Sequence, residues 1–70
     1  MGRAKLKEFL GARAFRPFTL VLTSDREITV PHPEFMAIAL LGHDAVIWNR
    51  RGIPQVIDLR WIVAHARRRT

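Results

Sequence analysis

The chain has 70 residues, with twelve Lys or Arg against six Asp or Glu, a formal net charge of +6 and no cysteine. This length allows one domain, residues 1–70, and the lack of cysteine excludes disulfides and thiolate metal sites. A domain of this size buries only about 60% of the surface that its unfolded chain exposes, so we expect self-association to help stabilise it.

The first predicted element is an amphipathic helix over about residues 3–14. Leu6, Phe9, Leu10 and Ala14 recur at spacings of three and four, which places them on one face. Pro17 ends the pattern, because the residue before a proline is disfavoured in the α conformation. We interpret this segment as a helix that packs over a sheet. A basic arm for nucleic acid and a helix lying on a membrane surface are the alternatives.

A pair of strands is predicted next, over residues 18–30. The even positions are apolar on both sides of a polar bend at residues 24–26, which is the period of a half-buried hairpin. The segment Pro31-His32-Pro33 then interrupts the sheet, because each proline removes a backbone donor. We expect a corner at this point in a long bent strand.

The remaining chain predicts short strands over residues 36–41, 45–49, 55–58 and 62–67, with a 3₁₀ turn at 59–61. Strands at this spacing indicate a fold that is mainly β with one N-terminal α-helix. The predicted architecture is a small SH3-like barrel of five strongly bent strands, spanning about residues 18–67, with the 3₁₀ turn before the last strand. A basic tail, residues 67–70, follows it.

The order of these elements resembles the Sm-like fold, including the Hfq group of bacterial RNA chaperones. The matching segments are residues 18–24 for the first strand, 27–41 for the long bent second strand and 45–50 for the third. The resemblance implies an Sm-like barrel that binds RNA as a homo-oligomer. Hfq carries a basic pair near its closing strands, and the matching positions here are Leu59 and Arg60. Only Arg60 is basic.

A second resemblance covers nearly the whole chain. Residues 15–18 (FRPF), 30–35 (VPHPEF) and 56–59 (VIDL) are similar to a group of short uncharacterised bacterial proteins. This similarity implies no particular activity.

Residue patterns for catalysis or metal binding are missing from the sequence. His32, His43 and His65 stand in three separate segments without a nearby carboxylate cluster, and Ser24 has no marked histidine partner. The four glycines are too far apart for a phosphate-binding loop. We therefore expect no enzyme, no catalytic residue, no metal and no cofactor.

The basic residues give the strongest functional indication. An excess of positive charge favours polyanionic partners, and phosphate contacts supply most of the affinity for nucleic acid. The candidate nucleic-acid-binding residues are Arg3, Lys5, Lys7, Arg13, Arg16, Arg50, Arg51, Arg60, Arg67, Arg68 and Arg69. Trp48 and Trp61 are predicted to lie in the core or at a subunit interface, with base stacking as the alternative.

These observations predict a non-catalytic module that binds RNA or single-stranded DNA through a basic face, as a homo-oligomer. The alternative is a protein-interaction or assembly module whose basic surface binds an acidic protein. No apolar run approaches the roughly 20 residues that a membrane span needs, and charges interrupt each apolar stretch before Arg16. We expect a cytoplasmic protein.

Overall fold

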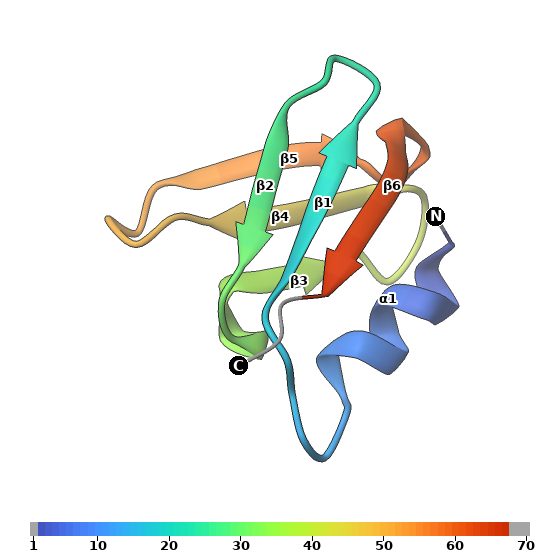
Figure 1. Cartoon of the computed structure of the whole chain (residues 1–70). Coiled ribbons are helices and arrows are strands. Elements are labelled where there is room, and N and C mark those ends of the chain that lie inside the picture. Colours follow the sequence, from blue (N-terminus) through green and yellow to red (C-terminus); the bar gives the residue numbers. More distant parts are fainter. Residues whose placement is uncertain (1, 68–70) are drawn as a thin grey trace.

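Two three-stranded antiparallel sheets and one α-helix make up the computed structural model, which describes residues 2–67 (Figure 1). The elements in chain order are α1 (Arg3–Leu10), β1 (Phe18–Leu22), β2 (Glu27–Val30), the 3₁₀ helix η1 (Pro33–Phe35), β3 (Met36–Ile38), β4 (Asp44–Trp48), β5 (Pro54–Asp58), the 3₁₀ helix η2 (Leu59–Trp61) and β6 (Ile62–Arg67). The mainly β class with one N-terminal helix is therefore confirmed. The 3₁₀ turn before the last strand is confirmed as well.

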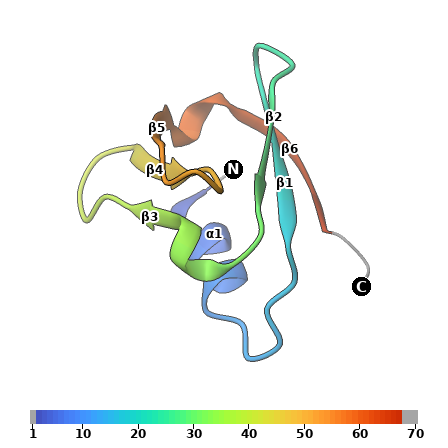
Figure 2. The same cartoon turned by 90° about the vertical axis from the view of Figure 1, so that its left-hand side faces the viewer.

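The first sheet has the strand order β2-β1-β6, and the second has the order β3-β4-β5. Figure 2 shows the two sheets as facing layers, with α1 across one end of the space between them. In the described part of the chain neither sheet closes on itself, so the structure has two open sheets where a five-stranded barrel was predicted.

The predicted long second strand is split into β2 and β3. Pro31 and Pro33 have no backbone N–H, so this stretch cannot continue a ladder. Pro33 instead begins η1, where the N–H of Phe35 donates to the carbonyl of His32 at 3.1 Å. The corner expected at this segment is therefore present, and it sends the chain from one sheet into the other.

Helix α1 ends about one turn earlier than predicted. Its last residue is Leu10, and the N–H of Gly11 donates to the carbonyl of Lys7 at 2.9 Å as the C-cap. Glycine is a poor residue for continuing a helix because it loses the most backbone freedom on folding. Leu6 and Phe9 form the buried face of the helix, as the spacing predicted.

The hydrophobic core lies between the sheets and under α1. In β1 the even positions are buried, which confirms the predicted period of two. Phe18 is fully buried, and its ring meets the ring of Phe9 edge-on with 5.2 Å between centroids. The core comprises Leu6, Phe9, Phe18, Leu20, Leu22, Ile28, Val30, Met36, Ala45, Ile47, Ile57, Leu59 and Ile62.

The last strand departs from strict alternation. His65 pairs with buried Leu20 and its ring lies 5.1 Å from the ring of Phe9, although the residue is exposed. The register between β1 and β6 shifts between Val21 and Leu22, so an extra residue enters β6. Such an irregularity reverses the alternation of faces beyond it.

Candidate nucleic-acid interface

Positive charge on this protein is at the surface and mostly unneutralised by its own acids. No charged side chain is buried among the described residues. In the same part of the chain, the pair Arg60–Asp58 is the one ion pair within 4.0 Å. Folding therefore leaves most of the cationic side chains available to a partner.

Two of the predicted basic residues, Arg3 and Arg60, lie at one hollow beside the start of α1. Its volume is about 520 Å³. It is lined by Gly2, Arg3, Gly42, His43, Leu59 and Arg60. These residues come from α1, the β3–β4 turn and η2, so three segments that are far apart in sequence meet here.

Arg3 joins α1 to the β3–β4 turn. Its Nη1 donates to the carbonyl of Leu40 at 3.0 Å, and its Nη2 donates to the carbonyl of Gly42. Neutral carbonyls accept these hydrogen bonds without cancelling the charge of the guanidinium. Arg3 therefore fixes the wall of the hollow and also adds a full positive charge to it.

Arg60 is oriented by Asp58, which caps η2. The carboxylate accepts from the backbone N–H of Arg60 at 2.8 Å, and the Nε and Nη2 of the same residue donate to it at 2.7–3.2 Å. The Arg60 side chain is still 69% exposed, whereas that of Asp58 is 16% exposed. A guanidinium held along one edge keeps its Nη1 directed away from the carboxylate, where a phosphate oxygen can accept from it.

The same contacts shift the pKa values of both Asp58 and Arg60. The side-chain hydrogen bond from Arg60, followed by its backbone N–H, lowers the pKa of Asp58 from 3.8 to about 2. The hydrogen bond to Asp58 raises the pKa of Arg60. Asp44 stands opposite Asp58 in the register of β4 and β5, and its charge contributes to the raised pKa of Arg60 after that of Asp58.

This pair predicts a specific acid response. Because the pKa of Asp58 is lower in the folded protein, its ionised form stabilises the fold above about pH 4, and this contribution disappears as the pH falls to about 2. The Asp58→Asn variant should therefore be less stable than the wild type at pH 7 and nearly equal to it at pH 2. Urea unfolding of both proteins at several pH values measures the difference. A difference that stays constant between pH 5 and pH 2 would contradict the assignment.

Among the described residues, none of the other predicted basic residues lines this hollow. Lys5 and Lys7 lie on α1, and the Nζ of Lys5 is 5.9 Å from the centre of the Phe9 ring. Arg13 and Arg16 lie between α1 and β1. Arg68 and Arg69 lie outside the described residues, and only the backbone of Arg67 is described.

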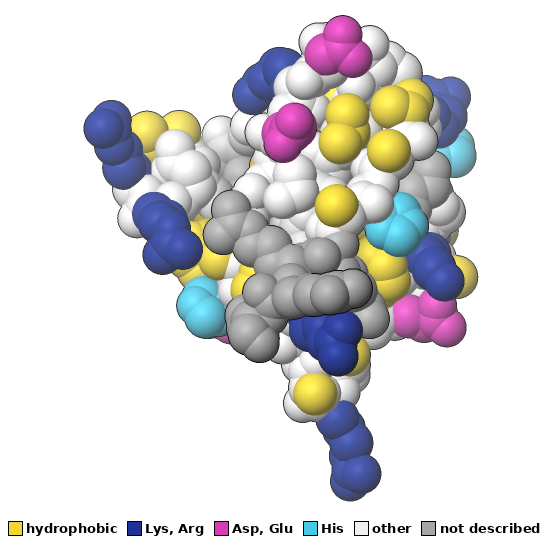
Figure 3. Space-filling model, in the orientation of Figure 1, with side chains coloured by type: hydrophobic (Ala, Val, Ile, Leu, Met, Phe, Trp, Pro, Cys, Tyr) yellow, Lys and Arg dark blue, Asp and Glu magenta, His cyan; other side chains and the backbone are white. Residues whose placement is uncertain are grey.

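Arg50 and Arg51 occupy the turn between β4 and β5, which Figure 1 shows on the opposite side of the molecule from α1. The Oδ1 of Asn49 accepts from the N–H of Arg51 at 2.9 Å and from that of Ile53 at 3.0 Å, which holds this turn. Figure 3 shows Lys and Arg side chains at several separate places around the face in view. The structure therefore does not bring all the predicted residues onto one face.

The three histidines lie in different surroundings. His43 lines the hollow, His32 lies against the ring of Phe35 at 5.8 Å, and His65 lies against Phe9. Across the described residues, no group of three or more His, Cys, Asp or Glu side chains is placed to hold a metal ion. No described helix is long and apolar enough to cross a membrane.

Two residues beside surface hollows were absent from the sequence-based set. His43, in the turn before β4, lines the Arg3–Arg60 hollow, and Arg26, in the bend at residues 24–26, lines another. The sequence shows the turns that carry them, but not which distant segments the turns approach. Neither a protein-family model, nor a curated protein, nor a solved structure matches this chain.

Proposed function

We propose that this chain is a non-catalytic module that binds RNA or single-stranded DNA through the basic surface around Arg3 and Arg60. The observation that carries the proposal is the meeting of two guanidinium groups at the hollow beside α1: Arg3 has no carboxylate within 4.0 Å among the described residues, and Arg60, although paired with Asp58, has a side chain that is 69% exposed. Contacts from cationic side chains to phosphates supply the sequence-independent part of nucleic-acid affinity. His43 at the same hollow adds a planar ring and hydrogen-bonding nitrogens.

The order of the strands supports an Sm-like form of this module. β2 and β3 are joined through η1 and together take the place of one bent strand, with β1 and β6 on one side and β4 and β5 on the other. In this proposal the two open sheets act as the two halves of an Sm-like barrel. The RNA partner that this resemblance implies agrees with the basic hollow.

The experiment is the binding of a fluorescent single-stranded oligonucleotide to matched charge variants. The Arg3→Gln, Arg60→Gln variant loses both guanidinium groups from the hollow, whereas the Arg50→Gln, Arg51→Gln variant loses the same charge from the distant turn. We expect only the first variant to lose most of its affinity. Equal affinity of both variants would show that the hollow is not the interface. The Arg3→Lys variant keeps the positive charge, so a comparison with it separates loss of charge from loss of structure. Thermal unfolding measures whether each variant is still folded.

Unprotected strand edges favour a second candidate function, an assembly module made of several copies of this chain. β5 and β6 are sheet edges, and Val56 and Val63 on them are 65% and 62% exposed. Pro54 and Asp58 at the ends of β5 and Arg67 at the end of β6 are residues of the kinds that protect edges, whereas residues 55–57 and 62–66 between them contain no proline, Lys, Arg, Asp or Glu. An acidic protein partner at the basic surface belongs to the same alternative.

Self-association predicts a mass that is a multiple of 8.1 kDa in light scattering at micromolar concentration. The Val56→Lys variant should shift this mass toward the monomer, because a lysine at an unpaired edge opposes pairing with another strand. Ala37→Lys, on the opposite edge of the same sheet, is the matched control. A wild-type mass that stays at 8.1 kDa would exclude the homo-oligomer.

A further inference from the structure

Two further hollows adjoin each other on another part of the surface from the Arg3–Arg60 hollow. The first, of about 270 Å³, lies between β2 and the β4–β5 hairpin, and the second, of about 280 Å³, lies between the β1–β2 turn, β5 and η2. Arg26 and Gln55 line both hollows. We call the two hollows together the Arg26 groove.

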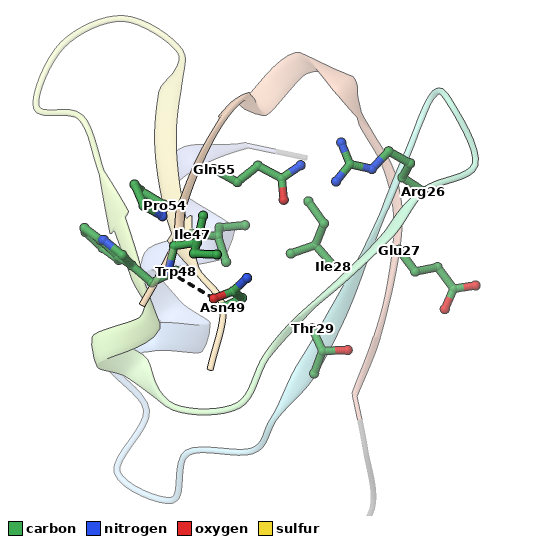
Figure 4. Close-up of a pocket in the computed structure, with 10 residues that line it drawn as sticks. Arg26, Glu27, Ile28, Thr29, Ile47, Trp48, Asn49, Pro54 and Gln55 are labelled. Atoms are coloured by element: carbon green, nitrogen blue, oxygen red, sulfur yellow. Dashed lines mark hydrogen bonds between the residues drawn. The ribbon is translucent and has the colours of Figure 1, made fainter. Parts of the chain in front are cut away.

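The centre of the Arg26 groove is polar and its floor is apolar. Figure 4 shows the side chains of Arg26 and Gln55 pointing toward each other from opposite walls, while Glu27 points away. Below them lie Ile28 and Ile47, which are 9% and 2% exposed. A few polar groups over an apolar floor are typical of sites that accept a planar organic group.

Arg26 is available to a ligand. It forms no ion pair with the described residues, although the acidic residues Asp25 and Glu27 flank it in sequence. Its position is fixed by the tight β1–β2 turn, in which the N–H of Leu22 donates to the carbonyl of Arg26 at 2.9 Å. Asp25 in this turn has a φ of 65°.

Trp61 forms the other end of the groove. Trp61 is 48% exposed, so of its two predicted places, the core and a subunit interface, the core of this chain is excluded. The carbonyl of Trp61 accepts from the N–H of Thr23 at 2.8 Å, which anchors η2 to the end of β1. An exposed indole on an anchored backbone is a preorganised stacking surface.

We infer that the Arg26 groove binds a single-stranded nucleic acid, with a base stacked on Trp61 and an adjacent phosphate contacted by Arg26. The net charge of +6 and the presence of Arg26 and Trp61 at the same hollow favour this ligand over an apolar peptide. The amide of Gln55 can both donate to and accept from a base edge. This inference rests on the proposed function and extends it to a second contact surface for the same strand.

Trp48 and Trp61 are the two tryptophans of the chain, so each can be made the single fluorescent reporter. In Figure 4 the ring of Trp48 points away from Arg26, at the far edge of the groove. An oligouridylate of roughly ten nucleotides, within the span of single-domain binders, should quench Trp61 emission in the Trp48→Phe variant. The Trp61→Phe variant retains only Trp48, which lines the far edge of the first hollow, so its emission should be quenched less. Equal quenching in both variants, or none in the first, would overturn the inference.

Affinity provides the second readout. Trp61→Ala should weaken binding of the same oligonucleotide by roughly ten-fold, which is within the range for loss of one base stack. Arg26→Gln should weaken it as well, whereas Val63→Ala, which trims another exposed apolar residue, should not. Urea unfolding confirms that each variant is folded before its affinity is interpreted.

Three outcomes separate binding at the Arg26 groove from the proposed function. If the Arg3→Gln, Arg60→Gln variant binds more weakly but the Trp61→Ala and Arg26→Gln variants do not, the strand does not bind in the Arg26 groove and the proposed function stands. If the wild-type protein binds no oligonucleotide, both are wrong. If Trp61→Ala lowers the mass in light scattering and leaves the affinity unchanged, the groove is an interface between copies and the inference is overturned.

Discussion

Replacing Phe18 by alanine should remove about 3–5 kcal/mol of stability, the usual cost of truncating a buried phenylalanine. Phe18 is fully buried and contacts Phe9 of α1 and Phe15 of the following segment, with centroid distances of 5.2 and 6.0 Å. The cavity would therefore open where the helix meets the first sheet. A small domain has a total stability of only about 0.05–0.15 kcal/mol per residue, so this loss should leave much of the variant unfolded.

Circular dichroism during urea unfolding at neutral pH measures this effect. Thr19→Ala is the matched control, because Thr19 is the next residue on the same strand and is only half-buried. Its Oγ1 lies 3.1 Å from the Oγ1 of Thr29, a cross-strand contact that contributes roughly 0.2–1 kcal/mol. A Phe18→Ala loss no larger than that of Thr19→Ala would mean that the contact between α1 and β1 does not hold the fold together.

The affinity for single-stranded RNA should fall about 100-fold when the salt concentration rises from 50 to 200 mM. Neutralising about five phosphates of a single strand gives a log–log slope near −3.5, because bound cations are released from the strand. Fluorescence anisotropy at four or five salt concentrations measures the slope. The Arg3→Gln, Arg60→Gln variant should have a slope shallower by about 1.4, since two phosphate contacts are lost.

The matched variant Arg50→Gln, Arg51→Gln should keep the wild-type slope, because its turn lies on the opposite side of the molecule from α1. An affinity that does not change with salt would remove phosphate contacts from the proposal. A slope reduced equally in both variants would mean that the whole charge of the protein, rather than the hollow, attracts the strand.

Periodicity predicted much of the fold because it reports directly on burial. The alternation from Phe18 to Leu22 gave the buried face of β1, and the interruption at Pro31 and Pro33 gave the corner. The end of α1 was placed too late because Ala14 continues the apolar spacing although Gly11 has already stopped the helix. The direction of His65 could not be found from alternation, since the extra residue in β6 appears only in its pairing with β1.

The candidate site was less predictable, because it depends on which turns meet. Charge composition indicated Arg3 and Arg60, but the sequence could not show that both line one hollow with His43. Arg26 was missed because a basic residue in a bend between strands is ordinary. Arg26 and Gln55 line the same two hollows because of how the two sheets face each other, which the sequence does not show.

The register of the sheets sets an order for folding. The second sheet pairs neighbours in sequence, as β3 with β4 and β4 with β5, whereas the first joins Leu20 of β1 to His65 of β6. Closing so long a loop costs entropy before any contact compensates for it. The β3-β4-β5 meander and the β1-β2 hairpin should therefore form early, while the pairing of β1 with β6 should form late. On a ribosome, one edge of β1 would stay unpaired until β6 emerges, which leaves that edge open to pairing with other chains.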